Sequence, residues 1–155
     1  MTLEELERYG LETMREEEIE AMLASHSVGV LGLPAEDMPY LVPLSYAYDD
    51  DSLYFTYLLG KESRKERLTE AVERGRFLVY DANSMFRWES VVVDGTFRKV
   101  PPSEWGDLAE VLAEAWRPRL FETASTARHV SIYAFDIVET SGIKQTDLPP
   151  GMQQR

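Results

Sequence analysis

The sequence predicts an α+β fold in which a small antiparallel β-barrel carries three or four flanking helices. About six segments have the pattern of strands, at residues 28–33, 40–48, 53–58, 77–80, 87–100 and 130–138. Turn-forming residues bound them, and they do not alternate with helices as the strands of a parallel sheet would. We expect a single domain over residues 1–155, with a flexible tail at residues 145–155 that ends in P-P-G-M-Q-Q-R.

The composition limits the classes of function. The chain has no cysteine, which excludes disulfides, thiolate metal sites and thiol catalysis. It shows neither a leader nor a long apolar run, so we expect a cytoplasmic protein without membrane contact. The 28 acidic residues outnumber the 16 basic ones and give a net charge of −12. Nucleic-acid binding is disfavoured, because its affinity comes largely from phosphate neutralisation.

The acidic surface has two explanations. Adaptation to a high-salt cytoplasm would favour a dense, hydrated carboxylate surface, and the 12 arginines against 4 lysines agree with it. The alternative is an ordinary acidic protein from a mesophile. We favour the first, and describe the chain as an acidic, halophilic protein on that basis.

Capping-box spacings mark two helix starts near the N-terminus. Thr2 and Glu5 begin a short helical turn that Gly10 ends, and Thr13 and Glu16 begin a longer helix. The apolar residues that share one face of the longer helix are Met14, Ile19, Met22 and Leu23.

The second strand, at residues 40–48, contains an unusual proline. Pro43 lacks a backbone donor, so it belongs at a strand edge or bulge, or where a ligand meets the backbone, and the sequence leaves both open. The acidic segment Asp49–Ser52 is expected to form a hairpin turn. It lacks the alternating ligands and distal Glu of a calcium-binding loop.

A third helix begins after Ser63, which has Glu66 at capping-box spacing. Arg64 and Lys65 lie in its first turn, a concentration of cationic donors in a strongly acidic chain. The simplest interpretation is plain helix capping with two surface charges. The other is a phosphate site, since a helix start offers free backbone N–H groups to an anion. The two interpretations are compatible.

Neither histidine has the surroundings of a catalytic or metal-binding group. His26 is flanked by serines that cannot easily make the hydrogen bond of a nucleophile–base pair, and His129 has no ligand partner at useful spacing. The dinucleotide and P-loop fingerprints are absent as well. We expect no metal site.

Four motifs in order resemble the pyridoxamine 5'-phosphate oxidase-like FMN-binding split-barrel family. They are P-Y-L-V-P-L-S-Y-A-Y-D at 39–49, L-Y-F-T at 53–56, S-R-K at 63–65 and W-E-S-V-V-V-D-G at 88–95. The resemblance covers about residues 18–100, with a final strand near 134–142. It implies a six-stranded antiparallel split β-barrel with flanking helices, and a homodimer with FMN in clefts between the subunits.

The resemblance also implies roles for individual residues. Ser63, Arg64 and Lys65 would hold the phosphate, the strand around Pro43 would run along the isoalloxazine ring, and Trp88 and Ser90 would reach the cofactor. The expected cofactor-binding residues are Pro43, Leu44, Ser45, Tyr46, Phe55, Thr56, Ser63, Arg64, Lys65, Trp88 and Ser90. An apolar stripe with Trp105 and Trp116, in a helix that Pro118 ends, suits a core or a dimer surface.

The chain departs from the family where vitamin B6 would bind. Leu41 and Tyr46 stand where true pyridoxamine phosphate oxidases carry cations, and near the C-terminus only Lys144 stands in for their substrate-binding arginines. These departures argue against vitamin B6 as the substrate. They leave the expected flavin site intact.

Two classes of function are therefore open. The first is an FMN-dependent oxidoreductase acting on an unidentified small molecule, in which the flavin carries the hydride chemistry and Ser45 or Tyr46 supplies a polar group near its reactive edge. The second is a module that binds flavin or haem, or a related deazaflavin, without turnover. An interaction domain without any ligand is a third alternative. The S-R-K motif favours a flavin, because haem needs no phosphate site.

The halophilic interpretation predicts that the melting temperature rises with salt. Screening shortens the Debye length from about 30 Å at 0.01 M to about 3 Å at 1 M, which weakens repulsion among the carboxylates. Thermal melts followed by circular dichroism across this range measure the effect. A melting temperature that stays flat or falls would contradict salt adaptation.

Overall fold

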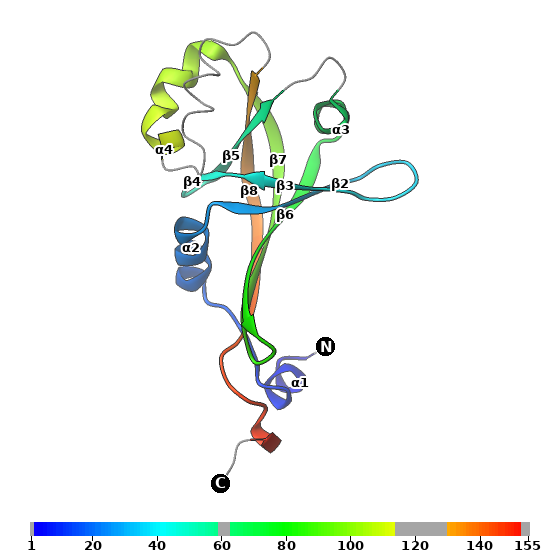
Figure 1. Ribbon diagram of the computed structural model, residues 1–155, viewed down its shortest axis with the longest axis vertical. Helices are drawn as coiled ribbons and strands as arrows, with labels where there is room; N and C mark the ends of the chain where they lie inside the picture. Colours follow the sequence, from blue (N-terminus) through cyan, green and yellow to red (C-terminus); the bar gives the residue numbers. More distant parts are fainter. Residues whose placement is uncertain (1, 59–62, 114–129, 153–155) are drawn as a thin grey trace.

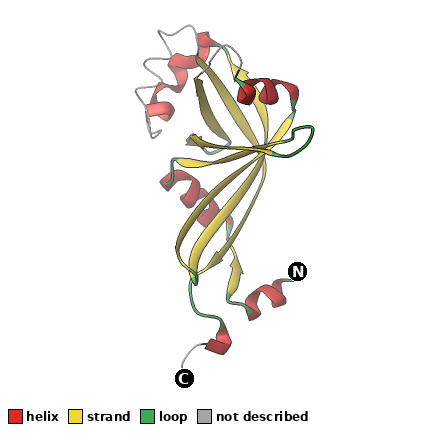
Figure 2. Ribbon diagram, turned by 45° about the vertical axis from the view of Figure 1, so that its right-hand side comes forward, coloured by secondary structure: helices red, strands yellow, loops and turns green. Residues whose placement is uncertain are grey.

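One antiparallel sheet of eight strands makes up most of the structure. The computed structural model describes residues 2–58, 63–113 and 130–152 (Figure 1). The strands are β1 (Leu11–Thr13), β2 (Val28–Leu33), β3 (Tyr40–Ser45), β4 (Ala47–Asp49), β5 (Ser52–Leu58), β6 (Arg74–Ser84), β7 (Arg87–Val100) and β8 (Val130–Gln145). Their order is β3-β2-β6-β7-β8-β5-β4, and β1 pairs separately with β8. The sheet curls into a half-barrel (Figure 2), which confirms the predicted fold class.

The strand count differs from the expected six because one predicted strand is two. The segment at residues 40–48 breaks at Tyr46, so that β3 lies at one end of the strand order and β4 at the other. Short β1 was not predicted. Pro43 lies in β3, which pairs only with β2, as the edge-strand interpretation requires. The expected hairpin turn joins β4 to β5, with Asp50 at a φ of 25°.

The helices are short and flank the sheet. They are α1 (Leu3–Arg8), α2 (Glu16–Ser25), α3 (Arg64–Ala71) and α4 (Ala109–Ala113), with 3₁₀ helices η1 (Pro102–Leu108) and η2 (Pro150–Met152). The Thr2–Glu5 capping box is confirmed. The predicted cap at Thr13 is wrong, because Thr13 belongs to β1 and the N-cap is Arg15, two residues later. No helix in the described part is long and apolar enough to cross a membrane.

Two apolar clusters lie on opposite faces of the sheet. The larger fills the half-barrel and includes the four predicted residues, Ile19, Met22 and Leu23 from α2 and Met14 from the segment just before it. The smaller lies between η1 and α4 and the strands β4, β5 and β8. Trp105 is buried there and its indole Nε1 donates to the Val100 carbonyl at 3.0 Å. Trp105 is therefore a core residue, and Trp116 lies outside the described residues.

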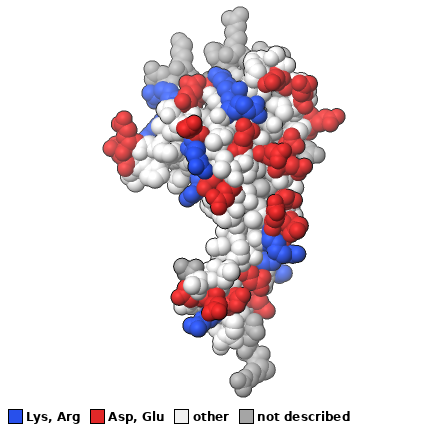
Figure 3. Space-filling view, turned by 180° about the vertical axis from the view of Figure 1, so that it is seen from behind, with Lys and Arg blue, Asp and Glu red and all other residues white. Residues whose placement is uncertain are grey.

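Three strands continue beyond the half-barrel as an arm. Figure 1 shows β6, β7 and β8 extending together, with α1 and the end of the chain beside their far end. Both β6 and β8 are longer than predicted, because each goes on pairing with β7 past the barrel. Gln145, the last residue of β8, is buried and accepts from the Trp88 indole at 3.2 Å. Acidic side chains outnumber basic ones along the barrel and arm (Figure 3).

An ion pair fastens α2 to the arm. The Lys144 ammonium donates to the Glu18 carboxylate and lies 3.7 Å from Glu12. Glu18 also accepts from the backbone and side chain of Arg15 at 3.3 and 3.1 Å. The hydrogen bond to Lys144, followed by those to Arg15, lowers the pKa of Glu18 to about 2. Lys144 stands where the family carries its substrate-binding arginines, and its ammonium is engaged in this ion pair within the fold.

We predict that Lys144→Met destabilises the protein at neutral pH and that the difference from the parent disappears in acid. The folded-state pKa of Glu18 is below its ordinary value of 4.5, so its ion pair stabilises the fold above that pH. The stabilisation is lost as the pH falls toward 2. Urea unfolding of both proteins at pH 7, 4 and 2.5 measures it, with the exposed Arg67→Met as control. A deficit that is constant across these pH values would contradict the assignment.

Candidate functional site

The start of α3 carries the predicted S-R-K motif at one end of the half-barrel. Ser63 is the N-cap, and its hydroxyl accepts from the Glu66 backbone N–H at 3.4 Å. The backbone N–H groups at the very start of a helix have no intrahelical acceptor, so they remain available to an anion. The capping interpretation is confirmed, and it leaves the phosphate interpretation open.

Two cations of the motif rest on tyrosine rings. The Arg64 guanidinium lies 5.1 Å from the Tyr40 ring centroid, and the Lys65 ammonium lies 4.7 Å from that of Tyr57. Arg64 is exposed, whereas Lys65 is half-buried, and burial lowers the pKa of its ammonium. Such cation–π contacts reduce the freedom of long side chains before any ligand binds. Arg64 is the cation better placed to meet a ligand from solvent.

The acidic residue of the same turn points into the half-barrel. The Glu66 carboxylate accepts from Ser131 Oγ at 3.1 Å and Tyr133 Oη at 3.2 Å, and Lys99 Nζ lies 3.5 Å away. Burial chiefly, and the nearby Glu66, raise the pKa of the Tyr133 hydroxyl. Because Glu66 is held by groups from β7 and β8, its charge is partly neutralised. The helix start therefore has the half-buried Ser63 as its cap, Arg64 exposed at the surface, and the Glu66 carboxylate directed inward.

The other predicted residues fall on different faces of the sheet. Pro43, Ser45, Trp88 and Ser90 lie on the outer face of the half-barrel, on β3 and β7. Leu44, Tyr46 and Phe55 belong to the barrel core. Thr56 is half-buried on β5, opposite Ile132.

Burial in the core limits the contacts that Tyr46 and Phe55 can make with a ligand. The Tyr46 hydroxyl donates to the Leu23 carbonyl at 2.8 Å, and burial raises its pKa. Phe55 packs between the rings of Phe77 and Phe135, with centroids 5.0 and 5.6 Å away. Neither side chain is exposed, so only their backbone atoms are left for contact with a ligand. Tyr46 does not supply a polar group to a reactive edge in this arrangement.

The part of the outer sheet face over β2, β3, β6 and the first half of β7 is apolar, and none of the described helices covers it. The register places Val30 beside Pro43 and Leu78, and Val92 beside Leu78. Val28, Tyr80 and Ile143 extend the same face and are 43%, 58% and 37% exposed. Apolar surface of this extent is typical of a binding or interaction face.

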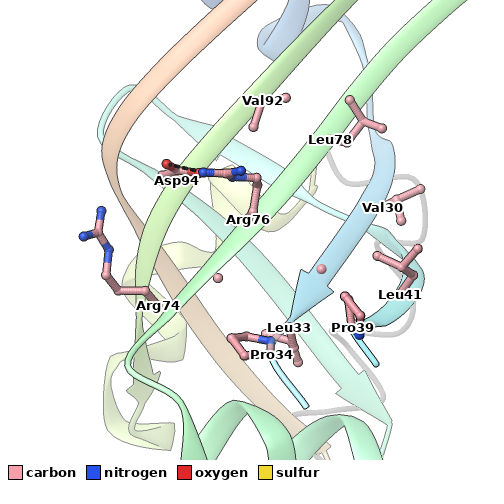
Figure 4. A pocket seen from close by; sticks show the side chains of 12 residues that line it. Val30, Leu33, Pro34, Pro39, Leu41, Arg74, Arg76, Leu78, Val92 and Asp94 are labelled. Atoms are coloured by element: carbon pink, nitrogen blue, oxygen red, sulfur yellow. Dashed lines mark hydrogen bonds and ion pairs between the residues drawn. The ribbon is translucent and has the colours of Figure 1, made fainter. Parts of the chain in front are cut away.

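A pocket of about 770 Å³ lies on this outer face, between β2, β3, β6 and β7 (Figure 4). Its walls are mainly apolar, and on one side Arg76 reaches across to Asp94. The hydrogen bond to Arg76 is the main cause that lowers the pKa of Asp94. Sequence reasoning missed the pocket. Alternation in 28–33 and 74–78 gave a signal, but nothing indicated that the outward positions would stay uncovered.

The described residues offer no cluster that could hold a metal ion. His26 Nδ1 lies 3.0 Å from the Met22 carbonyl and 3.1 Å from Ser25 Oγ, and its Nε2 faces Asp81 at 3.6 Å. The expectation that a neighbouring serine cannot easily bond to His26 is wrong for Ser25, although Ser25 Oγ and His26 Nδ1 both also contact the Met22 carbonyl and are engaged locally. His129 lies outside the described residues.

The fold and the site together define an antiparallel split half-barrel with an anion-receptive helix start and an open apolar face. Comparison with known protein families identifies the family to which the chain belongs. The chain matches the model described as "Pyridoxamine 5'-phosphate oxidase" over residues 15–144, and it belongs to that family.

Known relatives agree with the fold. A FAD-binding protein from Mesorhizobium loti is 28% identical, with a TM-score of 0.71 over 88% of this chain and 98% of that one. The FAD and haem binding protein of Mycobacterium smegmatis is 20% identical, with a TM-score of 0.68 over 90% of this chain and 75% of that one. The uncharacterized protein RA0666 of Rhizobium meliloti (strain 1021) is 28% identical over 59% of this chain and 58% of its own length.

Proposed function

We propose that this protein is a cytoplasmic flavin-dependent oxidoreductase that acts on a small molecule, with FMN as its cofactor. The observation that carries the proposal is the start of α3, where Ser63 is the N-cap and Arg64 is exposed while Glu66 is turned into the barrel. The similarity to a protein described as FAD-binding supports a flavin. A phosphate at this helix start suits FMN, which has a single terminal phosphate.

The residues of the chain would bind and orient the cofactor. Ser63 and the first backbone N–H groups of α3 would donate to the phosphate, and Arg64 and Lys65 would add charge-assisted hydrogen bonds. The exposed outer edge of β3, with Pro43 and Ser45, would lie beside the ring. When bound, the flavin supplies the hydride transfer, and the protein determines which molecule can approach it.

We propose further that the site is completed by a second copy of the chain. Trp88 and Ser90 lie at the start of β7, next to the hairpin turn at the far end of the arm, whereas α3 lies at the opposite end of the molecule (Figure 1). One protomer therefore cannot bring all the predicted residues to one ligand. An isologous dimer through the apolar outer face would bring the two groups together and cover Val28 and Tyr80.

A module that binds flavin without turnover is the second candidate. It is favoured by the burial of the Tyr46 hydroxyl, which removes the polar group expected near the reactive edge. The two candidates differ in whether bound flavin is reduced and reoxidised repeatedly, which stopped-flow absorbance with a nicotinamide reductant would measure.

We predict that Arg64→Ala combined with Lys65→Ala weakens FMN binding by about two to four orders of magnitude. Charge-assisted hydrogen bonds to phosphate contribute roughly 1.5–3 kcal/mol each, and the losses add if the two cations act independently. Fluorescence titration of FMN measures the affinity. Riboflavin lacks the phosphate, so it should bind weakly to the parent and change little in the variant.

The matched control is Arg67→Ala, which removes an exposed cation one turn further along α3. It should leave FMN affinity within about threefold of the parent, because a screened surface charge contributes little. Titration with FAD in parallel tests which flavin the site prefers. Equal FMN affinity in the parent and the double variant would refute the phosphate site.

We predict a dimer in solution that charge on the outer face disrupts. Val28→Asp combined with Tyr80→Asp places two carboxylates on the proposed interface core, where charged residues are disfavoured. Light scattering at micromolar concentration in molar salt should give a dimer for the parent and a monomer for this variant. Leu3→Asp, at an apolar residue on α1 that is more exposed than Val28 or Tyr80, is the control. A monomeric parent would overturn the dimer.

A further inference from the structure

The pocket on the outer sheet face has an apolar body built by four strands. Val30 and Leu41 come from β2 and β3, and Leu78 and Val92 from β6 and β7 (Figure 4). Its volume of about 770 Å³ is within the range of roughly 300–1,000 Å³ of small-molecule sites.

Gly32 lines the pocket and leaves space in it, because glycine has no side chain. A Cβ atom at Gly32 would lie 3.4 Å from Leu41 Cδ2 and 3.5 Å from the Arg76 carbonyl oxygen, which is ordinary van der Waals contact. The backbone would therefore accept a side chain at this position. Because Gly32 has no side chain, the space beside it stays open, and a larger residue at this position would project into the pocket.

One wall of the pocket is polar and already paired. Arg76 Nε and Nη2 donate to the two carboxylate oxygens of Asp94 at 2.6 and 3.1 Å. A guanidinium has five N–H donors, and the described residues form no further hydrogen bond to this one. Its side chain is 69% exposed, so the remaining donors are open to solvent beside the pocket that Arg76 lines.

Two further charged residues lie close to this wall. Arg74 lines the pocket with its guanidinium extended away from the centre (Figure 4), and Glu139 lines the hollow beside Arg76 and Asp94. Two cations and two carboxylates balance one another here, in a chain whose net charge is −12. An anion therefore meets less repulsion at this wall than over the acidic surface in general.

We propose that this pocket is a ligand site for a small aromatic or alicyclic carboxylate. The apolar walls would hold the ring, and the unused donors of Arg76 would bind the carboxylate. A cationic ligand suits the wall less, because both oxygens of Asp94 already accept from Arg76. The site goes beyond the proposed flavin site, and its binding geometry does not depend on a bound flavin.

The pocket and the proposed dimer can share the outer face. Interface cores are depleted of charged residues, and rims are polar. The wall with Arg76 and Asp94 therefore belongs to the rim, and Val28 and Tyr80 to the core. A partner would border the pocket without filling its charged end.

Fluorescence titration with 2-naphthoate and its neutral analogue 2-naphthamide tests the proposal on the full chain. We expect saturable binding of one naphthoate per chain, at least tenfold tighter than naphthamide. Gly32→Val, checked for folding by thermal melting, should abolish both. The control Gly106→Ala, where an added Cβ meets nothing within 4 Å, should change neither.

Two variants of the polar wall should change the affinity for naphthoate in opposite directions. Arg76→Met should weaken naphthoate about ten- to hundredfold and leave naphthamide unchanged, because a charge-assisted hydrogen bond is lost. Asp94→Asn should strengthen naphthoate, since Arg76 is then released to the ligand. Adventitious binding to apolar surface would respond to neither variant.

Several results would overturn the proposal. They are the absence of saturable binding, equal affinity for the two probes, unchanged binding in Gly32→Val, and displacement of naphthoate by saturating FMN. The last would assign the pocket to the flavin itself. If FMN does not bind at all, the flavin proposal fails and the probe titrations still decide the pocket.

Discussion

Tyr46 joins the two ends of the sheet, and the half-barrel depends on this junction. β3 and β4 are consecutive in the chain but lie at opposite ends of the strand order, so the chain must turn sharply between them. The Tyr46 N–H donates to the Ser27 carbonyl at 2.9 Å, its hydroxyl donates to the Leu23 carbonyl, and its ring packs edge-on against Phe77. One residue therefore ties α2, the start of β2 and β6 to the point of closure. The buried aromatic cluster around it follows from that closure.

The same junction explains which parts of the molecule could be predicted from the sequence. Strand-like segments bounded by turn-forming residues identified the strands, and the Thr2 and Ser63 caps identified two helix starts, because those signals are local. The break at Tyr46 was missed because the segment reads as one continuous strand, and only tertiary contacts with Leu23 and Phe77 select the bend. The cap at Thr13 failed for a similar reason, since pairing of β1 with β8 takes that residue out of the helix.

In the candidate site, too, some features follow from the local sequence and others depend on contacts with distant residues. The position of Ser63 at a helix start was predictable, but the inward turn of Glu66 depends on Ser131 and Tyr133, which are more than sixty residues away. An acidic chain can thus present a cationic helix start, because Glu66, the carboxylate of the first turn, is held by hydroxyl groups of Ser131 and Tyr133. The outer-face pocket was invisible to the sequence, which shows that Val30 and Leu78 alternate with core residues but not that their side of the sheet stays open.

The pairing of β1 with the end of β8 brings the two ends of the described chain to the same place. Leu11 lies opposite Gln145, and α1 and η2 both lie beyond the arm, remote from α3 (Figure 1). Within one protomer, a tether at either end would therefore lie on the far side of the molecule from the α3 helix start. The arm would act as a built-in spacer.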